Sequence, residues 1–224
     1  MVKRGMIFGS YDTAAQGWTL TSWKLTPGAR VENRVTVPGA VDGPRDYATA
    51  LTGGEPRYGN ATLTATFETS EGTRLEREAQ IRTFVNWVDG WRQNIILPDA
   101  PGYYLTGEIS VVKDYNDLAH AAVTVTGICA PWLYAETETA VTLTGTAAAQ
   151  TANLTNAGRR TVVPLLVITG GGSMLLEFGA ASWALGAGSY QLPDLVLPQG
   201  VHALTYSGEG MTCVITYREA VLPS

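Results

Sequence analysis

Histidine is the commonest general base and metal ligand in enzymes, and this chain has two, His120 and His202. Neither histidine is separated from another potential ligand by the number of residues typical of a zinc site. His120 follows a turn-rich segment and His202 lies in an alternating strand-like run, so we interpret both as ordinary surface or cross-strand residues. No Gly-x-Ser-x-Gly motif presents a serine nucleophile, and a Ser-His-Asp triad is therefore not indicated.

Two carboxylates, Asp42 and Asp46, could be considered as an acid–base pair for glycoside hydrolysis. Asp42 lies within residues 38–44, and Asp46 lies just after them. This segment contains two Pro and two Gly, which is typical of a turn-rich loop in which Asp stabilises the local backbone. The run Gly170-Gly171-Gly172 lacks the following Lys, Ser or Thr and helix of a phosphate loop, and we predict a hairpin turn there. The sequence therefore predicts no catalytic, cofactor-binding or metal-binding residue.

Aromatic side chains are the remaining candidates for a binding site. The six tryptophans could form a sugar-stacking platform, although packing in cores and interfaces is their more frequent use. They are Trp18, Trp23, Trp87, Trp91, Trp132 and Trp183. The run from His202 to Thr205 does not supply the His-x-Asn-Pro-Arg strand of a galectin-type sugar site.

The cysteines and the apolar runs indicate the compartment. Cys129 and Cys213 are the only cysteines, which excludes a disulfide framework, and we expect both to be small buried side chains. The N-terminus shows no apolar core of a signal peptide, and the longest apolar run, 162–168, is too short to span a membrane. We expect the chain to fold in a cytoplasm.

Charge is scarce and unevenly distributed. Of the 224 residues, 16% are charged and 45% are hydrophobic, which excludes intrinsic disorder. Residues 1–135 carry 12 basic and 14 acidic side chains, and residues 136–224 carry 3 and 6, for a net charge of −5. Nucleic-acid binding through a basic face is not predicted, because phosphate neutralisation requires clustered Lys and Arg.

Most of the chain alternates apolar and polar residues with the period of a β-strand. Residues 18–21 and 61–67 predict two strands, and residues 104–112 and 121–128 predict a long hairpin that turns over residues 114–117.

One segment has a helical pattern instead. Thr73 and Glu76 fit a capping box, and Ile81, Phe84, Val85 and Val88 form one apolar stripe. Asp89-Gly90 supplies a stop, so a single helix is predicted over 73–88 and should lie against one face of a sheet. We expect its polar face, with Glu76, Arg77, Glu78 and Arg82, to be solvated.

The sequence pattern changes near Ala130: residues 131–134 close the first part, and charged residues become scarce after them. Short strands follow at about ten-residue spacing with Gly or Pro between them, which is typical of a β-sandwich. The predicted strands are 141–144, 162–169, 174–178, 189–192, 201–206 and 212–217. We therefore predict a mainly β protein with a first domain over 1–135, a tail-tube-like β-barrel or sandwich with one packed helix, and a second domain, a galectin-like β-sandwich, over 136–224.

The order of several motifs carries a family resemblance that covers nearly the whole chain. The first part has, in sequence, Ile7-Phe8-Gly9-Ser10-Tyr11-Asp12, Val37-Pro38-Gly39-Ala40-Val41-Asp42-Gly43, Arg57-Tyr58-Gly59-Asn60, a strand ending at Phe67, one helix, and a strand pair closing at Trp132. The second has Asn156-Ala157-Gly158, Val163-Pro164-Leu165 and a late run from Leu197 to Tyr206. Together they resemble the two domains of the distal tail proteins of long-tailed phages.

This resemblance implies a structural protein of the virion, assembled in the host cytoplasm, and not an enzyme. It implies a homo-hexameric ring of N-terminal domains that joins the tail-tube protein to the tail-tip hub protein and can anchor a receptor-binding protein, with the galectin-like domains projecting outward. No cofactor, sequence-specific nucleic-acid binding or membrane insertion is implied. Six copies would carry a net charge of −30, so a channel wall with a share of the acidic groups would repel DNA phosphates.

Two features depart from the family pattern. Residues 39–43 contain Ala40 and Val41 where a more polar loop is common, and the second domain has no room for an inserted carbohydrate-binding module. Three alternatives remain: another tail-tube-like ring component, a carbohydrate-binding module that uses aromatics of residues 136–224, and a β-sandwich hydrolase.

Overall fold

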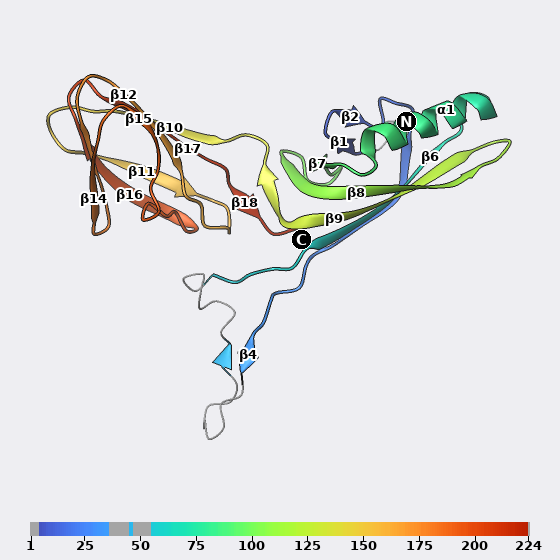
Figure 1. Cartoon of the computed structure of the whole chain (residues 1–224), viewed down its shortest axis with the longest axis horizontal. Coiled ribbons are helices and arrows are strands. Elements are labelled where there is room, and N and C mark those ends of the chain that lie inside the picture. Colours follow the sequence, from blue (N-terminus) through green and yellow to red (C-terminus); the bar gives the residue numbers. More distant parts are fainter. Residues whose placement is uncertain (1–4, 36–44, 47–54, 224) are drawn as a thin grey trace. The chain divides into compact units, whose positions relative to one another are not determined.

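The computed structural model describes residues 5–35, 45–46 and 55–223, which form two compact units (Figure 1). Unit 1 is Met1–Leu133 with Leu222–Ser224, and unit 2 is Tyr134–Val221. The mainly β class is confirmed, with one α-helix among the described residues. The return of the chain to unit 1 at Leu222 was not expected from the sequence.

Unit 1 is built on one antiparallel sheet. Its strands, in spatial order, are β2 (Tyr11–Asp12), β1 (Ile7–Phe8), β7 (Arg92–Ile96), β8 (Tyr103–Asn116), β9 (Ala121–Ala135), β6 (Ala61–Thr69) and β3 (Thr19–Thr26). Strand β6 shows why the sheet has two different faces: Leu63, Ala65 and Phe67 are buried, whereas Thr62 and Thr64 between them are exposed.

The buried face is covered by α1 (Arg74–Val88), as predicted. The capping box is confirmed: the Thr73 N–H donates to Glu76 Oε2 (2.6 Å), and the Glu76 N–H donates to Thr73 Oγ1 (3.3 Å). The helix ends at Val88 with Asp89 as its C-cap, and Gly90 follows with a φ of +75°, a conformation that favours glycine.

Phe84 of α1 lies at the centre of an aromatic cluster that joins the helix to the sheet. Its ring centroid lies 5.2–6.3 Å from those of Trp18, Tyr11, Phe67 and Phe8. Ile81 and Val88 of the predicted stripe are also buried. Burial of this stripe, rather than intrinsic helix propensity, supplies most of the stability of such a helix.

The expectation that Arg77 lies on a solvated helix face is wrong. Its side chain is 2% exposed, and it donates from Nη1 to the Gly72 carbonyl (2.6 Å) and from Nη2 to the Asp117 carbonyl (2.9 Å). One carbonyl lies just before the start of the helix and the other in the hairpin turn. They accept hydrogen bonds from two nitrogens of the planar guanidinium group, which needs such acceptors when it is buried.

The β8–β9 hairpin is longer than predicted, and its turn lies further along the chain. Asp114 stays in β8, where its Oδ2 accepts a hydrogen bond from Thr124 Oγ1 (2.6 Å). The turn is instead formed at Asp117, whose Oδ1 accepts the N–H groups of Ala119 and His120, both at 2.7 Å. Figure 1 shows α1 lying beside this hairpin.

Unit 2 is a sandwich of two four-stranded antiparallel sheets. One has the order β10 (Thr139–Thr144), β17 (Thr212–Tyr217), β12 (Leu165–Thr169), β15 (Gly188–Gln191). The other has the order β11 (Gln150–Asn156), β16 (Gly200–Ser207), β13 (Met174–Phe178), β14 (Ala181–Leu185). Buried side chains of both sheets, including Leu154, Leu166, Leu204 and Ile215, form a common core. The short strand β18 (Ala220–Val221) ends the unit, and within the unit the Ala135 N–H donates to the Glu219 carbonyl (3.0 Å).

The prediction of a hairpin turn at 170–172 is wrong, because this segment joins β12 of one sheet to β13 of the other. Gly170 has a φ of +131°, and a Cβ there would lie 2.5 Å from the Gly210 carbonyl oxygen. The glycine therefore permits a close approach between this segment and the segment at Gly210 that leads into β17.

Strands β4 (Arg34–Val35) and β5 (Arg45–Asp46) pair as a separate two-stranded ribbon. The motif at 37–43 lies outside the described residues. The candidate pair Asp42 and Asp46 also falls outside the residues whose side chains are described.

Candidate assembly surfaces

The two histidines make ordinary structural contacts. The backbone N–H of His120 donates to the Asp117 side chain in the hairpin turn. His202 Nε2 lies 2.9 Å from the Pro198 carbonyl oxygen, and its ring centroid lies 6.2 Å from that of Phe178. The two residues belong to different units.

The cysteines are buried free thiols, as expected. Burial raises the pKa of Cys129 and that of Cys213 to about 11, so both stay protonated near neutral pH. Within the described residues, no group of three or more His, Cys, Asp and Glu side chains is placed to hold a metal ion. Over the same residues, α1 has neither the length nor the composition of a bilayer-spanning helix.

The six tryptophans do not form one platform. Trp18 is fully buried, Trp132 packs edge-on against Tyr58 with ring centroids 5.5 Å apart, and Trp23 and Trp183 are half-buried. Only Trp87 and Trp91, at 56% and 63% exposure, are open to a partner, and both belong to unit 1. The large exposed apolar side chains described in unit 2 are aliphatic, which does not favour a sugar-stacking site over 136–224.

The sheet of unit 1 exposes a face rich in hydroxyl groups, opposite the face that α1 covers. Its cross-strand pairs include Lys24 with Thr64, Thr64 with Thr126, and Thr66 with Thr124. We define this hydroxyl face by Ser22, Lys24 and Thr26 of β3, Thr62, Thr64 and Thr66 of β6, and Thr124, Thr126 and Ile128 of β9. Alternating Thr in the sequence signals such a face, but not what it contacts.

Hydrogen bonds fix several of these hydroxyl groups. Thr124 Oγ1 donates to Asp114 and lies 3.4 Å from Thr66 Oγ1, and Thr21 Oγ1 donates to the Thr66 carbonyl (3.1 Å). The hydroxyl face therefore presents an ordered polar surface with one basic residue, Lys24, among those that define it.

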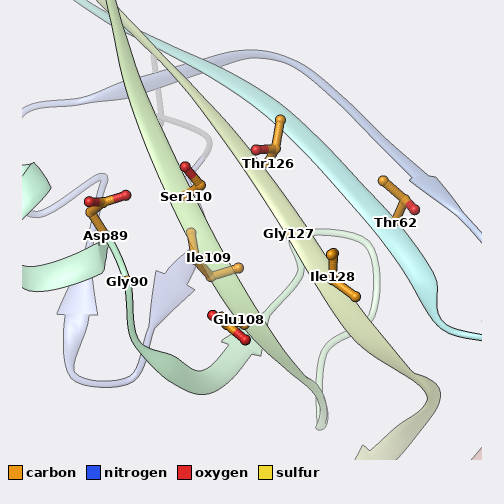
Figure 2. Close-up of a pocket in the computed structure, with 9 residues that line it drawn as sticks. All are labelled: Thr62, Asp89, Gly90, Glu108, Ile109, Ser110, Thr126, Gly127 and Ile128. Carbon is orange, nitrogen blue, oxygen red and sulfur yellow. The ribbon is translucent and has the colours of Figure 1, made fainter.

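A shallow depression of about 460 Å³ lies where this face meets β8 (Figure 2). Thr62, Thr126 and Ile128 line it together with two carboxylates, Asp89 and Glu108. Asp89 Oδ1 accepts the Val111 N–H at 2.7 Å and so holds the end of α1 against β8. No basic residue lines the depression, so its chemistry favours contact with neutral groups and repels anions.

Strand β3 forms one edge of the sheet and is eight residues long. A register shift between Leu20 and Ser22 marks a β-bulge, and Lys24 is exposed further along. Bulges and lysines on an edge strand oppose uncontrolled pairing, while the edge itself offers backbone groups to a specific partner.

The sheets of unit 2 are almost free of charge. Strands β10, β17, β12 and β15 contain no Asp, Glu, Lys or Arg, and the other sheet contains one, Glu177. The charges gather where the chain enters the unit: Arg218 donates to the carbonyls of Ala135 (2.5 Å) and Glu136 (2.7 Å) and pairs with Glu138 at 3.0 Å.

No family model and no curated protein matches the sequence. Among solved structures, the SPP1 Dit (gp 19.1) protein, described as a paradigm of the hub adsorption apparatus in phages that infect Gram-positive bacteria, matches with a TM-score of 0.66. That match is 14% identical in sequence and covers 96% of this chain and 98% of the other. A chain of the phage p2 baseplate matches with a TM-score of 0.47 at 8% identity, over 92% of each chain.

The likeness to SPP1 Dit extends over nearly the whole of both chains, so it includes both units of this one. It agrees with the resemblance drawn from the order of the sequence motifs. The chain has the fold of the distal tail protein of phage SPP1.

Proposed function

We propose that this chain is a distal tail protein: a structural component of a phage tail tip that forms a six-fold ring between the tail tube and the tail-tip hub. The observation that carries the proposal is the two-unit fold, which matches SPP1 Dit over 96% of this chain. A tube subunit alone needs only the first unit, and the second unit therefore argues against another tail-tube-like ring component.

In this proposal the hydroxyl face of unit 1 is the wall of the DNA channel. Threonine hydroxyls, with Asp114 hydrogen-bonded among them, offer DNA no cluster of cations to bind. A surface that DNA must slide past should be polar and should not hold phosphates. The depression beside Glu108 adds to that character.

The ring itself requires a heterologous contact, in which two different surfaces of the chain meet and the rotation between copies closes. The exposed edge of β3 offers one such surface. The nearly uncharged sheets of unit 2 suit contacts with receptor-binding or other tail proteins, because the centres of protein interfaces are depleted of charge. The protein works in the virion after assembly in the host cytoplasm.

The test is mass photometry of the purified full chain over a range of concentrations, followed by negative-stain imaging. We expect six-fold rings with a central hole. A particle of one or two copies at every concentration, with and without the tail-tube protein, would contradict the ring. In a parallel glycan-array screen, selective binding by the full chain would instead support a carbohydrate-binding module.

A further inference from the structure

Strand β10 forms a free edge of the sandwich in unit 2. It lies at the end of its sheet, and among the described strands it pairs with β17 alone. Along its other side, the outward N–H and C=O groups of the backbone have no strand to pair with. An extended chain segment is the kind of partner that can satisfy such a row of donors and acceptors.

This edge lacks the features that keep other edges from pairing. Its six residues, Thr139–Thr144, follow β17 without a register shift and include no charged residue, Pro or Gly. By contrast, the edge strand β3 of unit 1 has a bulge and an exposed lysine, Lys24. Because bulges, prolines and lysines are the usual protection of an edge strand, β10 is an edge open to a partner.

The neighbouring edge, β11, is less suited to a partner. It contains two Asn, a residue type depleted in strands, and its Thr155 carbonyl already accepts a hydrogen bond from the Tyr217 hydroxyl (2.6 Å). At the far end of the β10 sheet, β15 has only four residues and begins with Gly188, which weakens a strand. Among these edges, β10 offers the longest regular run of strand-forming residues.

The core of the sandwich is also incompletely covered beside β10. Val141 and Leu143 face the core, and the residues between and after them are exposed. Leu143 is buried, whereas Val141 packs against the core and is only half-buried. A strand added to this edge would cover Val141, so burial of apolar area would add to the backbone hydrogen bonds.

These features define the segment that the edge can accept. Backbone spacing is the same in all strands, so an extended segment can pair with β10 without two particular surfaces having to be complementary. Every second side chain of the segment would lie beside Val141 and should be apolar. The others would lie beside exposed Ala140 and Thr142, in a sheet without charged residues, and should be uncharged.

We propose that β10 accepts an extended segment of another tail protein as an additional strand of its sheet. Pairing of β10 with β10 of a second copy would relate the two copies by a two-fold axis, which is not the head-to-tail relation of neighbours in a ring. The source of the segment rests on the proposed function, whereas the open edge does not. This contact gives unit 2 a specific place to hold a partner.

Hydrogen exchange with a synthetic peptide tests the edge in the full chain. The probe alternates Val and Thr and has a Lys at each end for solubility. At saturating concentration it should slow exchange of the β10 amides and leave those of β14 unchanged. The same peptide with a methyl group on every amide nitrogen cannot donate hydrogen bonds and should give no protection. Failure to protect β10, equal protection of β14, or equal protection by the methylated peptide would each overturn the docking edge.

A charged variant separates this edge from the rest of unit 2. Val141→Lys places an ammonium group that a paired strand would bury, so it should weaken binding of the peptide at least about tenfold. Ala184→Lys adds the same charge at an exposed position of the edge strand β14 and should bind the peptide as the natural chain does. Thr142→Lys, exposed on β10, should also weaken binding and gives the same test if Val141→Lys does not fold. Natural affinity in a folded Lys variant of β10 would contradict the proposal.

The source of the segment is tested in the assembled particle. The β10 amides should exchange more slowly in purified tails that contain this protein than in isolated rings, and equal exchange would show that no other tail protein occupies the edge. Negative-stain images of Val141→Lys should show the same rings as the natural chain. Loss of rings in this variant alone would assign the edge to a contact between copies and overturn the proposed partner. If the natural chain forms no rings but the peptide protects β10, the docking edge stands and the proposed ring is wrong.

Discussion

One buried polar side chain in each unit holds together backbone segments that are distant in sequence. Arg77 joins Gly72 to Asp117 in unit 1. In unit 2, Asn156 Nδ2 donates to the carbonyls of Arg160 and Leu197, both at 2.9 Å, and its Oδ1 accepts the Gly158 N–H at 3.0 Å. Removing either side chain would leave buried carbonyls without donors, and that loss exceeds the net value of the hydrogen bonds.

Arg77→Met should destabilise unit 1 by about 2–4 kcal/mol, because two carbonyls lose charged donors. Arg77→Lys should fall between this variant and the natural protein, since an ammonium group lacks the guanidinium fork. Urea unfolding measures the change. Arg82→Ala, an exposed change on the same helix, should stay within about 0.5 kcal/mol; an equal effect of Arg77→Met would refute the role assigned to Arg77.

Asn156→Ala should destabilise unit 2 by about 2–4 kcal/mol, because the loop that follows β11 loses its link to Leu197. Hydrogen exchange measured by mass spectrometry should show faster exchange of the Val162 and Leu197 amides, which pair across this link. Asn153→Ala, exposed on the same strand, is the control. Unchanged protection of both amides in Asn156→Ala would show that the link is dispensable.

At the scale of elements, the helix and some strands can be predicted from short sequence patterns, whereas the order of the strands depends on contacts between residues distant in sequence. The helix was predictable because Thr73, Glu76 and the apolar stripe are all local to it. Strand β6 was predictable because one of its faces is buried and the other exposed. The order of strands, in which β7 lies between β1 and β8, depends on contacts that no local pattern encodes.

The missed elements have physical reasons. In β11 most side chains are polar and Leu154 is the one buried apolar residue, so alternation is weak. In β7 the apolar residues Ile95 and Ile96 are adjacent rather than alternating. The prediction that Arg77 is solvated was wrong because its acceptors, the carbonyls of Gly72 and Asp117, come together only in the folded unit. The exposure of Trp87 and Trp91 likewise depends on tertiary packing.

The junction between α1 and the β8–β9 hairpin should be sensitive to acid. Backbone hydrogen bonds from Thr73 lower the pKa of Glu76, those from His120 and Ala119 lower that of Asp117, and hydrogen bonds from Lys113 and Asn116 lower that of Glu78. A carboxyl whose pKa is lower in the folded state contributes stability above its unfolded pKa, and this contribution is lost as the pH falls through the folded pKa.

Unit 1 should therefore lose stability as the pH falls from the ordinary carboxyl range toward stronger acid. Thermal unfolding followed across that range measures this slope. The triple variant Glu76→Gln, Glu78→Gln, Asp117→Asn should be less stable at neutral pH and show a flatter slope. Glu177→Gln, exposed in unit 2, should keep the natural slope, and a triple variant that does the same would refute the assignment.

At the scale of the whole molecule, the proposed channel wall makes a prediction about DNA. Assembled rings of the natural chain should not retain double-stranded DNA. Thr64→Lys with Thr126→Lys would place two adjacent cations per copy on the hydroxyl face, and those rings should bind DNA with an affinity that falls steeply with salt. Electrophoretic mobility shifts at several salt concentrations measure this.

The matched control is Thr142→Lys with Thr216→Lys, which adds the same charge to β10 and β17 of unit 2. If both double variants retain DNA equally, net charge alone explains the effect and the hydroxyl face is not the channel wall.

The absence of charged residues from β10, β17, β12 and β15 has a consequence for the conditions in which unit 2 keeps its shape. Dissolved ions act on a protein chiefly by screening its charges, and acidity acts by protonating them. The strands of this sheet carry no charged side chain that salt could screen or acid could protonate. Burial raises the pKa of Cys213 to about 11 and also raises that of Tyr217, so these two groups stay neutral near pH 7. We therefore expect this sheet to keep the same fold over a wide range of salt concentration and pH.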